Sequence, residues 1–298
     1  MRVLLLHNPT AGNDRMPKED LVNLLSRAGC EVDYLPSDDP GLGERLSDPV
    51  DLVAIAGGDG TVAKVLTQVR GANGAPMNAA VTILPMGTAN NLARALGIRA
   101  PVADLIEGLR NGRIVPLDVG ETEGPWGRQR FFESAGFGAI ARALGPVNES
   151  RVPSREKIPQ GRKAMREVFK DMPPARLEVI LDDCRLEDDL LMLELSKIAS
   201  LGPQLCLAPQ ADPGDGLLHV CALPAARREE MLAWLDDPEG SGAAPMVVHT
   251  SREVKVTWRD TPSHLDDFFH EPARQPQVMR AWLEPSAVKI LVPGKRTG

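Results

Sequence analysis

The chain has 298 residues, 43% of them hydrophobic and 25% charged, a composition typical of a globular protein long enough for two domains. Its 34 Lys and Arg residues against 41 Asp and Glu give a formal net charge of −7, which argues against nucleic acid as a partner. No apolar stretch approaches the roughly 18 residues that a membrane-spanning helix needs, and the apolar run 3–6 is too short for a signal peptide. The four cysteines are dispersed without a CxxC pair, which indicates thiols in a reducing cytoplasm.

The first 120 residues alternate between predicted strands and helices. Strands are expected over 3–7, 31–35, 53–56, 81–84 and 114–119, and helices over 19–28, 43–46, 62–69, 88–96 and 101–109. This alternation predicts an open parallel sheet with helices on both faces, in which ligands bind beyond the carboxyl ends of the strands. The glycine-bearing turns at 8–12, 57–61 and 85–91 all belong to that edge.

The pattern changes beyond about residue 121. Strand-like segments, connected mainly by turns, cover 131–135, 177–181, 190–195, 205–208, 217–222, 254–258, 278–283 and 288–291. They predict antiparallel β structure, interrupted by helices over 161–171 and 224–236 and by a polar, proline-bearing loop over 145–163. The predicted fold is therefore an α/β domain over 1–120 followed by a β-rich domain over 121–284.

Residues 52–61, LVAIAGGDGT, are the most informative segment of the chain. The apolar run indicates a buried strand, and apolar residues at helical spacing follow the glycines. A glycine-rich turn thus leads to a helix N-terminus, where free N–H groups and the helix dipole favour phosphate. Asp59 lies among these amides, and a carboxylate beside a polyphosphate needs a divalent cation between them. The turn predicts a Mg-nucleotide site; the alternative is a tight turn whose glycines serve geometry alone.

Residues 84–94, LPMGTANNLAR, repeat this design, with a strand, a glycine turn, and Thr88 as the predicted N-cap of a helix. The two segments together resemble the catalytic domain of the diacylglycerol kinases, a family that includes other lipid kinases and the sphingosine kinases. NAD kinases and phosphofructokinases share related forms of GGDGT, but NAD kinases lack the second segment. The resemblance implies an NAD kinase-like or phosphofructokinase-like parallel sheet, with 285–298 packing back on the first domain.

The resemblance implies that ATP lies in a cleft between the domains, with its phosphates against 57–61 and 87–90. The turn NPTAG at 8–12 is similar to the family's NPxSG turn, although alone it is a common turn signature. The implied nucleotide-binding residues are Asn8, Pro9, Thr10, Gly12, Ser37, Gly57, Gly58, Asp59, Gly60, Thr61, Gly87, Thr88, Asn90 and Asn91. Asn91 stands where the family often has Asp, which implies weakened Mg²⁺ binding.

Two further segments are implied to bind metal. LDVG at 117–120 is similar to a family strand whose Asp joins the metal network. The resemblance therefore implies that Asp118, like Asp59, is a metal ligand. Residues 207–218 are similar to a segment in which Asp212, Asp215 and the Leu217 carbonyl hold a structural Mg²⁺. The alternative for this segment is an Asp-Gly turn before a strand. The family's NGR…GGG stretch is replaced by SKIASLGP at 196–203.

The resemblance is weakest for the catalytic base. Lipid kinases of this family carry an LDGE-like turn whose Asp accepts the proton of the lipid hydroxyl, and this chain has no DGE. The Leu-Asp pair survives at Asp266, which is therefore the first candidate for the base, with Asp267 and Glu271 as alternates. The region 258–272 also contains histidines, so a transition-metal cluster is conceivable, but nothing fixes ligand spacing there. A solvated acidic loop is the preferred interpretation.

The resemblance thus implies a cytoplasmic, Mg²⁺-dependent lipid kinase of phospholipid metabolism. It would transfer the γ-phosphate of ATP to a diacylglycerol-like or sphingoid hydroxyl, using Asp59 and Asp266 in catalysis and contacting membranes transiently. A homodimer is compatible with the sequence. Two alternatives stay open: an NAD kinase-like enzyme, and a nucleotide- or lipid-binding protein with weakened catalysis, suggested by Asn91 and the missing DGE.

Overall fold

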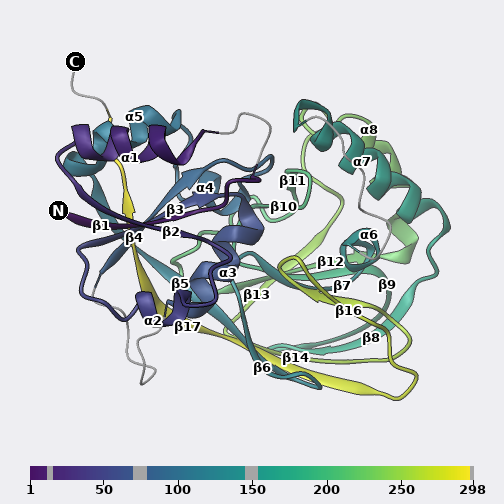
Figure 1. The fold of residues 1–298 in the computed structure, drawn as a ribbon. Helices are drawn as coiled ribbons and strands as arrows, with labels where there is room; N and C mark the ends of the chain where they lie inside the picture. The colour runs from purple at the N-terminus through teal and green to yellow at the C-terminus, as the bar shows by residue number, and fades with distance from the viewer. Residues whose placement is uncertain (12–15, 70–78, 145–153, 296–298) are drawn as a thin grey trace. The chain divides into compact units, whose positions relative to one another are not determined.

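The structure is a computed structural model that describes residues 1–11, 16–69, 79–144 and 154–295 (Figure 1). The chain divides into two compact units, one formed by Met1–Asp118 with Pro285–Gly298 and the other by Val119–Glu284. The predicted fold class is confirmed, since the first unit has a parallel sheet with helices and the second has antiparallel strand pairs.

The first unit is built on parallel strands in the order β17-β4-β3-β1-β2. Their bounds are Arg2–His7 for β1, Glu31–Pro36 for β2, Leu52–Gly57 for β3, Ala80–Pro85 for β4 and Gln277–Val292 for β17. Every residue of β3 is buried, which explains why its sequence is a continuous apolar run rather than an alternating one. The last strand, β17, joins this sheet by pairing in parallel with β4, with Ile290 opposite Val81.

The helices of the first unit follow their strands. They are α1 (Lys18–Arg27), α2 (Leu42–Arg45), α3 (Asp59–Gln68), α4 (Asn91–Ala95), α5 (Val102–Glu107) and the 3-10 turn η1 (Gly108–Asn111). Figure 1 shows α1 and α5 side by side on one face of the sheet. The expectation that Thr88 caps α4 is wrong. Asn90 occupies the N-cap position with φ 48°, because its side chain bonds the backbone of Gly87 and delays the first helical residue to Asn91.

The second unit is built from antiparallel strand pairs, and its two two-residue strands form a small sheet of their own. Its strands are β5 (Arg113–Gly124, which begins in the first unit), β6 (Gly127–Phe131), β7 (Ser134–Gly138), β8 (Ala175–Ile180), β9 (Arg185–Ser196), β10 (Ser200–Leu201), β11 (Leu205–Cys206), β12 (Leu218–Pro224), β13 (Val247–Ser251), β14 (Glu253–Trp258), β15 (Ser263–Leu265) and β16 (Phe268–His270). Inward-facing apolar side chains of β7, β8, β9, β12 and β14 form its core. The helices are α6 (Ala139–Leu144), α7 (Ser154–Asp171), η2 (Ala225–Arg227) and α8 (Arg228–Asp236).

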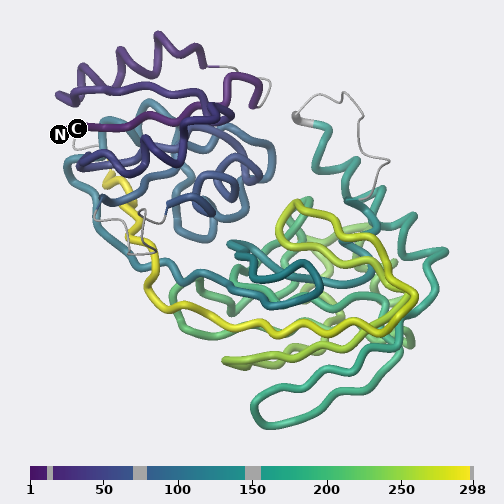
Figure 2. The backbone as a smooth tube through the Cα atoms, turned by 60° about the horizontal axis from the view of Figure 1, so that its bottom comes forward, coloured from purple at the N-terminus to yellow at the C-terminus, as the bar shows by residue number. Residues whose placement is uncertain are grey.

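Several predicted boundaries were wrong. The segments 278–283 and 288–291 belong to the single strand β17, which Figure 2 traces without interruption in yellow. The segment 131–135 is divided between β6 and β7, because the intervening amides bond a side chain instead of a neighbouring strand.

The predicted loop over 145–163 is helical from Ser154 onward, and its first part, 145–153, lies outside the described residues. The apolar side chains Met165 and Phe169 of α7 are buried, and the helix extends N-terminally from this packed half. Within the described ranges, no helix is both long and apolar enough to span a membrane.

Candidate active site

Asn8 connects two of the predicted nucleotide turns. Its Nδ2 donates to Thr61 Oγ1 at 3.0 Å, and its Oδ1 accepts hydrogen bonds from Thr10 N (3.0 Å) and Thr10 Oγ1 (2.8 Å). Its backbone N–H donates to Ala56 O at 2.9 Å. One side chain therefore shapes the turn after β1 and ties it to the first turn of α3, 53 residues away.

The glycines after β3 and β4 allow two turns to touch. A Cβ on Gly87 would lie 2.5 Å from Gly58 Cα, and a Cβ on Gly58 would lie 3.1 Å from Gly87 Cα. Gly57 is similarly confined, because an added Cβ would lie 2.6 Å from Thr61 Cβ. The close approach is held by Met86 N, which donates to Gly57 O at 2.8 Å. These positions require glycine for space, since none of the three has a left-handed φ.

The turn after β4 is closed by its own side chain. Asn90 Oδ1 accepts the Gly87 N–H and Asn90 Nδ2 donates to Gly87 O, both at 2.9 Å. Asn91 follows as the first residue of α4 and is buried, whereas Thr88 is half-buried and caps nothing. The Asn90 amide is thus committed to shaping the turn.

Asp59, Gly60 and Ser37 also lie at or near this edge. Asp59 is the first residue of α3 and is half-buried, and Gly60 is exposed beside it. Ser37 is buried directly after β2 and donates its N–H to His7 O at 2.9 Å. Asp118 is buried on β5 and accepts the Ser286 N–H at 2.7 Å. Asp118 lies toward the opposite edge, because its partner Ser286 precedes Ile290, and Ile290 pairs with Val81 near the amino end of β4. Pro9 is exposed in the turn after β1, and Gly12 lies outside the described residues.

The predicted structural metal site has the hydrogen bonds of a turn. Asp212 Oδ1 accepts the Gly214 N–H at 2.9 Å, and Asp215 Oδ1 accepts the Leu217 N–H at 2.9 Å. Asp215 Oδ2 lies 3.0 Å from His219 Nε2, so both oxygens of this carboxylate have protein partners. Across the ranges that the structure describes, no group of three His, Cys, Asp or Glu residues is placed to hold a metal ion. Asp212, Asp215 and Leu217 therefore remain predicted ligands only.

The first candidate for the base, Asp266, lies in the tight turn between β15 and β16. Its Oδ1 accepts backbone N–H groups from Phe132, Glu133 and Ser134 at 3.1, 2.8 and 3.2 Å. Among the residues that the structure describes, its Oδ2 accepts only the Phe132 N–H, at 2.9 Å. Burial raises the pKa of Asp266 to about 6, against the opposing effect of these donors. Because Oδ2 has the spare lone pairs, it is the oxygen able to accept a further proton.

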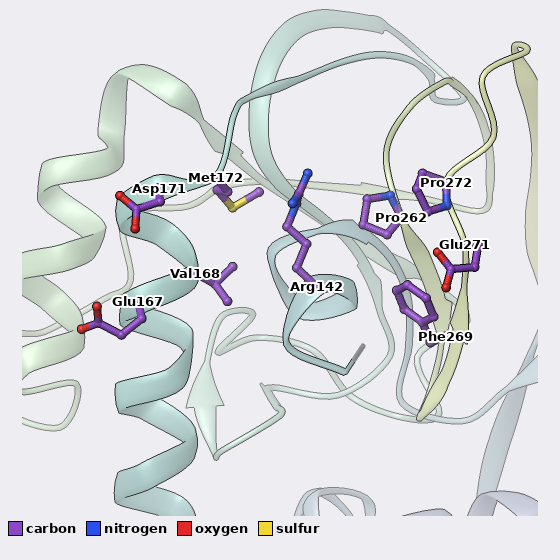
Figure 3. A pocket seen from close by; sticks show the side chains of 9 residues that line it. All are labelled: Arg142, Glu167, Val168, Asp171, Met172, Pro262, Phe269, Glu271 and Pro272. Carbon is purple, nitrogen blue, oxygen red and sulfur yellow. The ribbon is translucent and has the colours of Figure 1, made fainter. Parts of the chain in front are cut away.

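The alternates differ from Asp266 in their surroundings. Asp267 lies at the tip of the hairpin, where the residue as a whole is exposed, and partial desolvation of its carboxyl group raises its pKa. Glu271 is exposed beyond β16 and lines a cavity of about 460 Å³ with residues of α6 and α7 (Figure 3). The wall of this cavity includes the apolar side chains of Val168, Met172 and Phe269.

The interpretation of 258–272 as a solvated acidic loop is wrong. The segment contains the hairpin β15–β16, and β15 pairs with β7 through Ser263, His264 and Leu265. His264 is only 2% exposed and lies against Glu194, which is fully buried on β9. Sequence reasoning missed Glu194, although one acidic residue within the apolar run LLMLEL was a signal for a buried charge that needs a partner.

Comparisons with known proteins add to this geometry. The profile described as the diacylglycerol kinase catalytic domain matches residues 2–122. A diacylglycerol kinase of Bacillus subtilis (strain 168) is 26% identical over 243 residues, covering 78% of this chain and 76% of that protein. A probable YegS-like lipid kinase of Klebsiella pneumoniae (strain 342) is 30% identical over 231 residues, covering 73% and 72%.

Solved structures share the fold. A putative diacylglycerol kinase from Bacillus anthracis str. Sterne superposes with a TM-score of 0.75 at 17% identity, covering 98% of this chain and 97% of the other. An NAD kinase from Archaeoglobus fulgidus in complex with ATP superposes with a TM-score of 0.55 at 12% identity, covering 99% and 94%. The same architecture therefore occurs in proteins named for lipid and for dinucleotide phosphorylation.

Proposed function

Since the chain belongs to the diacylglycerol kinase catalytic-domain family, we propose that it transfers the γ-phosphate of ATP to the hydroxyl of a lipid. Its relatives are named kinases, which supports phosphoryl transfer as the reaction class. The lipid acceptor and the use of ATP are the parts that the proposal adds, together with transient contact with a membrane surface, where such an acceptor resides.

The observation that carries this proposal is the joining of three turns at one edge of the parallel sheet. Asn8 bonds Thr61, and Gly58 touches Gly87, so the turns after β1, β3 and β4 form one continuous surface. The N-terminus of α3 lies at this surface, and a helix N-terminus favours phosphate through its backbone N–H groups and dipole. The absence of side chains at Gly58 and Gly87 lets the two turns lie against each other. Phosphoryl transfer depends mainly on such positioning and on electrostatic stabilisation.

The residues of the first unit fit a magnesium ion that is bound together with a nucleotide. Mg²⁺ is usually held by one or two carboxylates, water and substrate phosphates rather than by a complete protein cage. Asp59 is half-buried at the start of α3 and would supply such a carboxylate. The strand register places the other predicted carboxylate of this unit, Asp118, toward the opposite edge of the sheet. When bound, the ion would neutralise charge on the phosphates.

Asp266 is our candidate for the general base, acting through Oδ2. A carboxylate whose pKa is about 6 is mostly ionised at pH 7 and yet basic enough to accept a proton in the transition state. The bonds that Phe132, Glu133 and Ser134 donate to Oδ1 hold the carboxylate in one orientation.

A lipid is the acceptor that the second unit supports best. The hairpin that carries Asp266 also borders the cavity of Figure 3. Its wall includes the apolar side chains of Phe269 and Pro262 on one side and of Val168 and Met172 on the other, with Arg142 between them. A dinucleotide acceptor, the second candidate, is supported by the fold shared with the NAD kinase in complex with ATP.

Incubation with radiolabelled ATP and Mg²⁺ tests the proposal, in parallel with total lipid extract and with NAD. Label in an organic-extractable product supports a lipid kinase, and label in NADP supports the second candidate. Asp59→Ala is the negative control for both arms. ATP binding without label in either product would overturn the proposal in favour of a binding protein.

A further inference from the structure

A buried acid–histidine pair lies directly beneath the Asp266 turn. Glu194 is 0% exposed on β9, and His264 is 2% exposed on β15. His264 Nε2 lies 3.1 Å from both carboxylate oxygens of Glu194, and His264 Nδ1 lies 2.8 Å from the backbone carbonyl oxygen of Asp266. The imidazole ring therefore connects a side chain of the central sheet to the main chain of the proposed base.

The strand register builds this contact across an intervening strand. Gly136 on β7 stands opposite Glu194 on one side and opposite His264 on the other, so the three residues form one row across β9, β7 and β15. A Cβ at Gly136 would overlap both oxygens of Glu194. The missing side chain is what allows the carboxylate and the imidazole to meet over the middle strand.

The hydrogen-bond chemistry of this row requires an extra proton. A carbonyl oxygen only accepts hydrogen bonds, and so does a carboxylate, whereas a neutral imidazole has a single N–H. With acceptors at both ring nitrogens, the row holds one proton more than neutral imidazole and carboxylate together. His264 is thus an imidazolium paired with the Glu194 carboxylate, or a neutral imidazole paired with the protonated carboxyl group. In either form the buried side chains of Glu194 and His264 serve as each other's hydrogen-bond partners.

The Asp266 turn is held from two sides. Asp266 has φ 48°, a left-handed conformation that non-glycine residues adopt at a cost, and its N–H donates to Ser134 O at 2.8 Å. The β6–β7 junction holds its carboxylate, and His264 holds its carbonyl.

We propose that Glu194 and His264 are positioning residues that fix the Asp266 carboxylate in the orientation needed to accept the proton of the acceptor hydroxyl. This inference rests on the proposed function. Neither residue needs to touch the substrate, because both act through the main chain of Asp266. A displacement of about 1 Å at a reacting group can lower a rate by about 100-fold, so losing this support has a measurable kinetic effect.

His264→Phe and Glu194→Gln distinguish positioning from simple packing. The phenyl ring retains the volume but donates to neither acceptor, so kcat should fall about 10- to 100-fold while KM for ATP stays within about twofold. Glu194→Gln should keep kcat within about threefold, because a Gln amide can donate to Nε2 of a neutral imidazole whose Nδ1–H still reaches the Asp266 carbonyl. His249→Phe, at a half-buried histidine of β13, is the matched control and should retain the parental kcat.

A double substitution supplies the decisive comparison. In the Asp266→Ala background, His264→Phe should cause no further loss of kcat, since a residue that acts only through Asp266 has nothing left to position. Equal losses in both backgrounds, or an unchanged kcat in folded His264→Phe, would overturn the inference. If His264→Phe does not fold, His264→Gln, which can donate to only one of the two acceptors, takes its place in the same comparison.

Amide hydrogen exchange at Phe132, Glu133 and Ser134, which donate to the Asp266 carboxylate, measures how firmly the turn is held and does not depend on catalytic activity. It should accelerate in His264→Phe but not in Glu194→Gln or His249→Phe. An inactive parental enzyme would overturn the proposed function, whereas unchanged exchange in His264→Phe would overturn the positioning inference.

Discussion

Gly87→Ala tests whether the contact between the turns after β3 and β4 builds the nucleotide site. Its added Cβ would lie 2.5 Å from Gly58 Cα and 2.8 Å from Asn90 Oδ1. Carbon atoms pack best at about 3.5–4.0 Å, so the two turns must separate by about 1 Å. The φ of Gly87 is not left-handed, so the cost arises from this contact rather than from the backbone conformation.

The expected effect on nucleotide binding and turnover is larger than the effect on folding. Overpacking of this kind destabilises a protein by about 1–3 kcal/mol. If the two turns hold the same phosphates, as proposed, a 1 Å displacement between them should lower kcat/KM for ATP by about 100-fold. The assays are ATP binding by isothermal titration calorimetry, initial rates at varied ATP, and the melting temperature.

Gly43→Ala is the matched control in the same unit. Its Cβ would make an ordinary contact, 3.7 Å from Gln68 Oε1, and Gly43 lies within the short helix α2, where alanine is favoured over glycine. This variant should bind ATP like the parent and melt at the same or a slightly higher temperature. A folded Gly87→Ala protein with parental ATP affinity would refute the role assigned to the two turns.

Four further outcomes are expected. Asp59→Ala should abolish phosphoryl transfer with little change in melting temperature, since a carboxylate in a turn contributes little packing; parental turnover would remove Asp59 from the metal site. The kcat should fall about tenfold per pH unit below about pH 6 and level off above it, because Asp266 acts as a base in its ionised form and burial raises its pKa to about 6. A kcat that stays constant down to pH 5 would contradict the assignment of Asp266 as the base. Separate alanine substitutions at Asp266, Asp267 and Glu271 should give one variant slowed about 10²–10⁴-fold, at Asp266, and two mild ones, and three mild variants would show that this hairpin does not supply the base. Asp215→Asn should lower either the melting temperature or the stimulation by magnesium, and if it changes neither, the segment is only a turn.

The sequence alone predicted the secondary structure correctly where a short, local pattern specifies it. The buried run before GGDGT and the periodic apolar residues after it specify a strand, a turn and a helix within about twenty residues, because burial on both faces of β3 and on one face of α3 leaves a direct pattern in the chain. The same local patterns, repeated at the turn after β4, identified the family and the fold class. They failed at boundaries such as the start of α4, where one Asn90 side chain decided which residue became helical.

Only the tertiary structure decided the surroundings of Asp266. The row of Glu194, Gly136 and His264 joins residues as far apart in the chain as positions 136 and 264. It exists because β9 and β15 both pair with β7, with Glu194 and His264 opposite the same residue, Gly136. No short pattern encodes a register between distant strands, since it depends on how the whole sheet buries its apolar face. For that reason an acidic segment that looks solvated in the sequence folds into a hairpin that buries a histidine against a carboxylate.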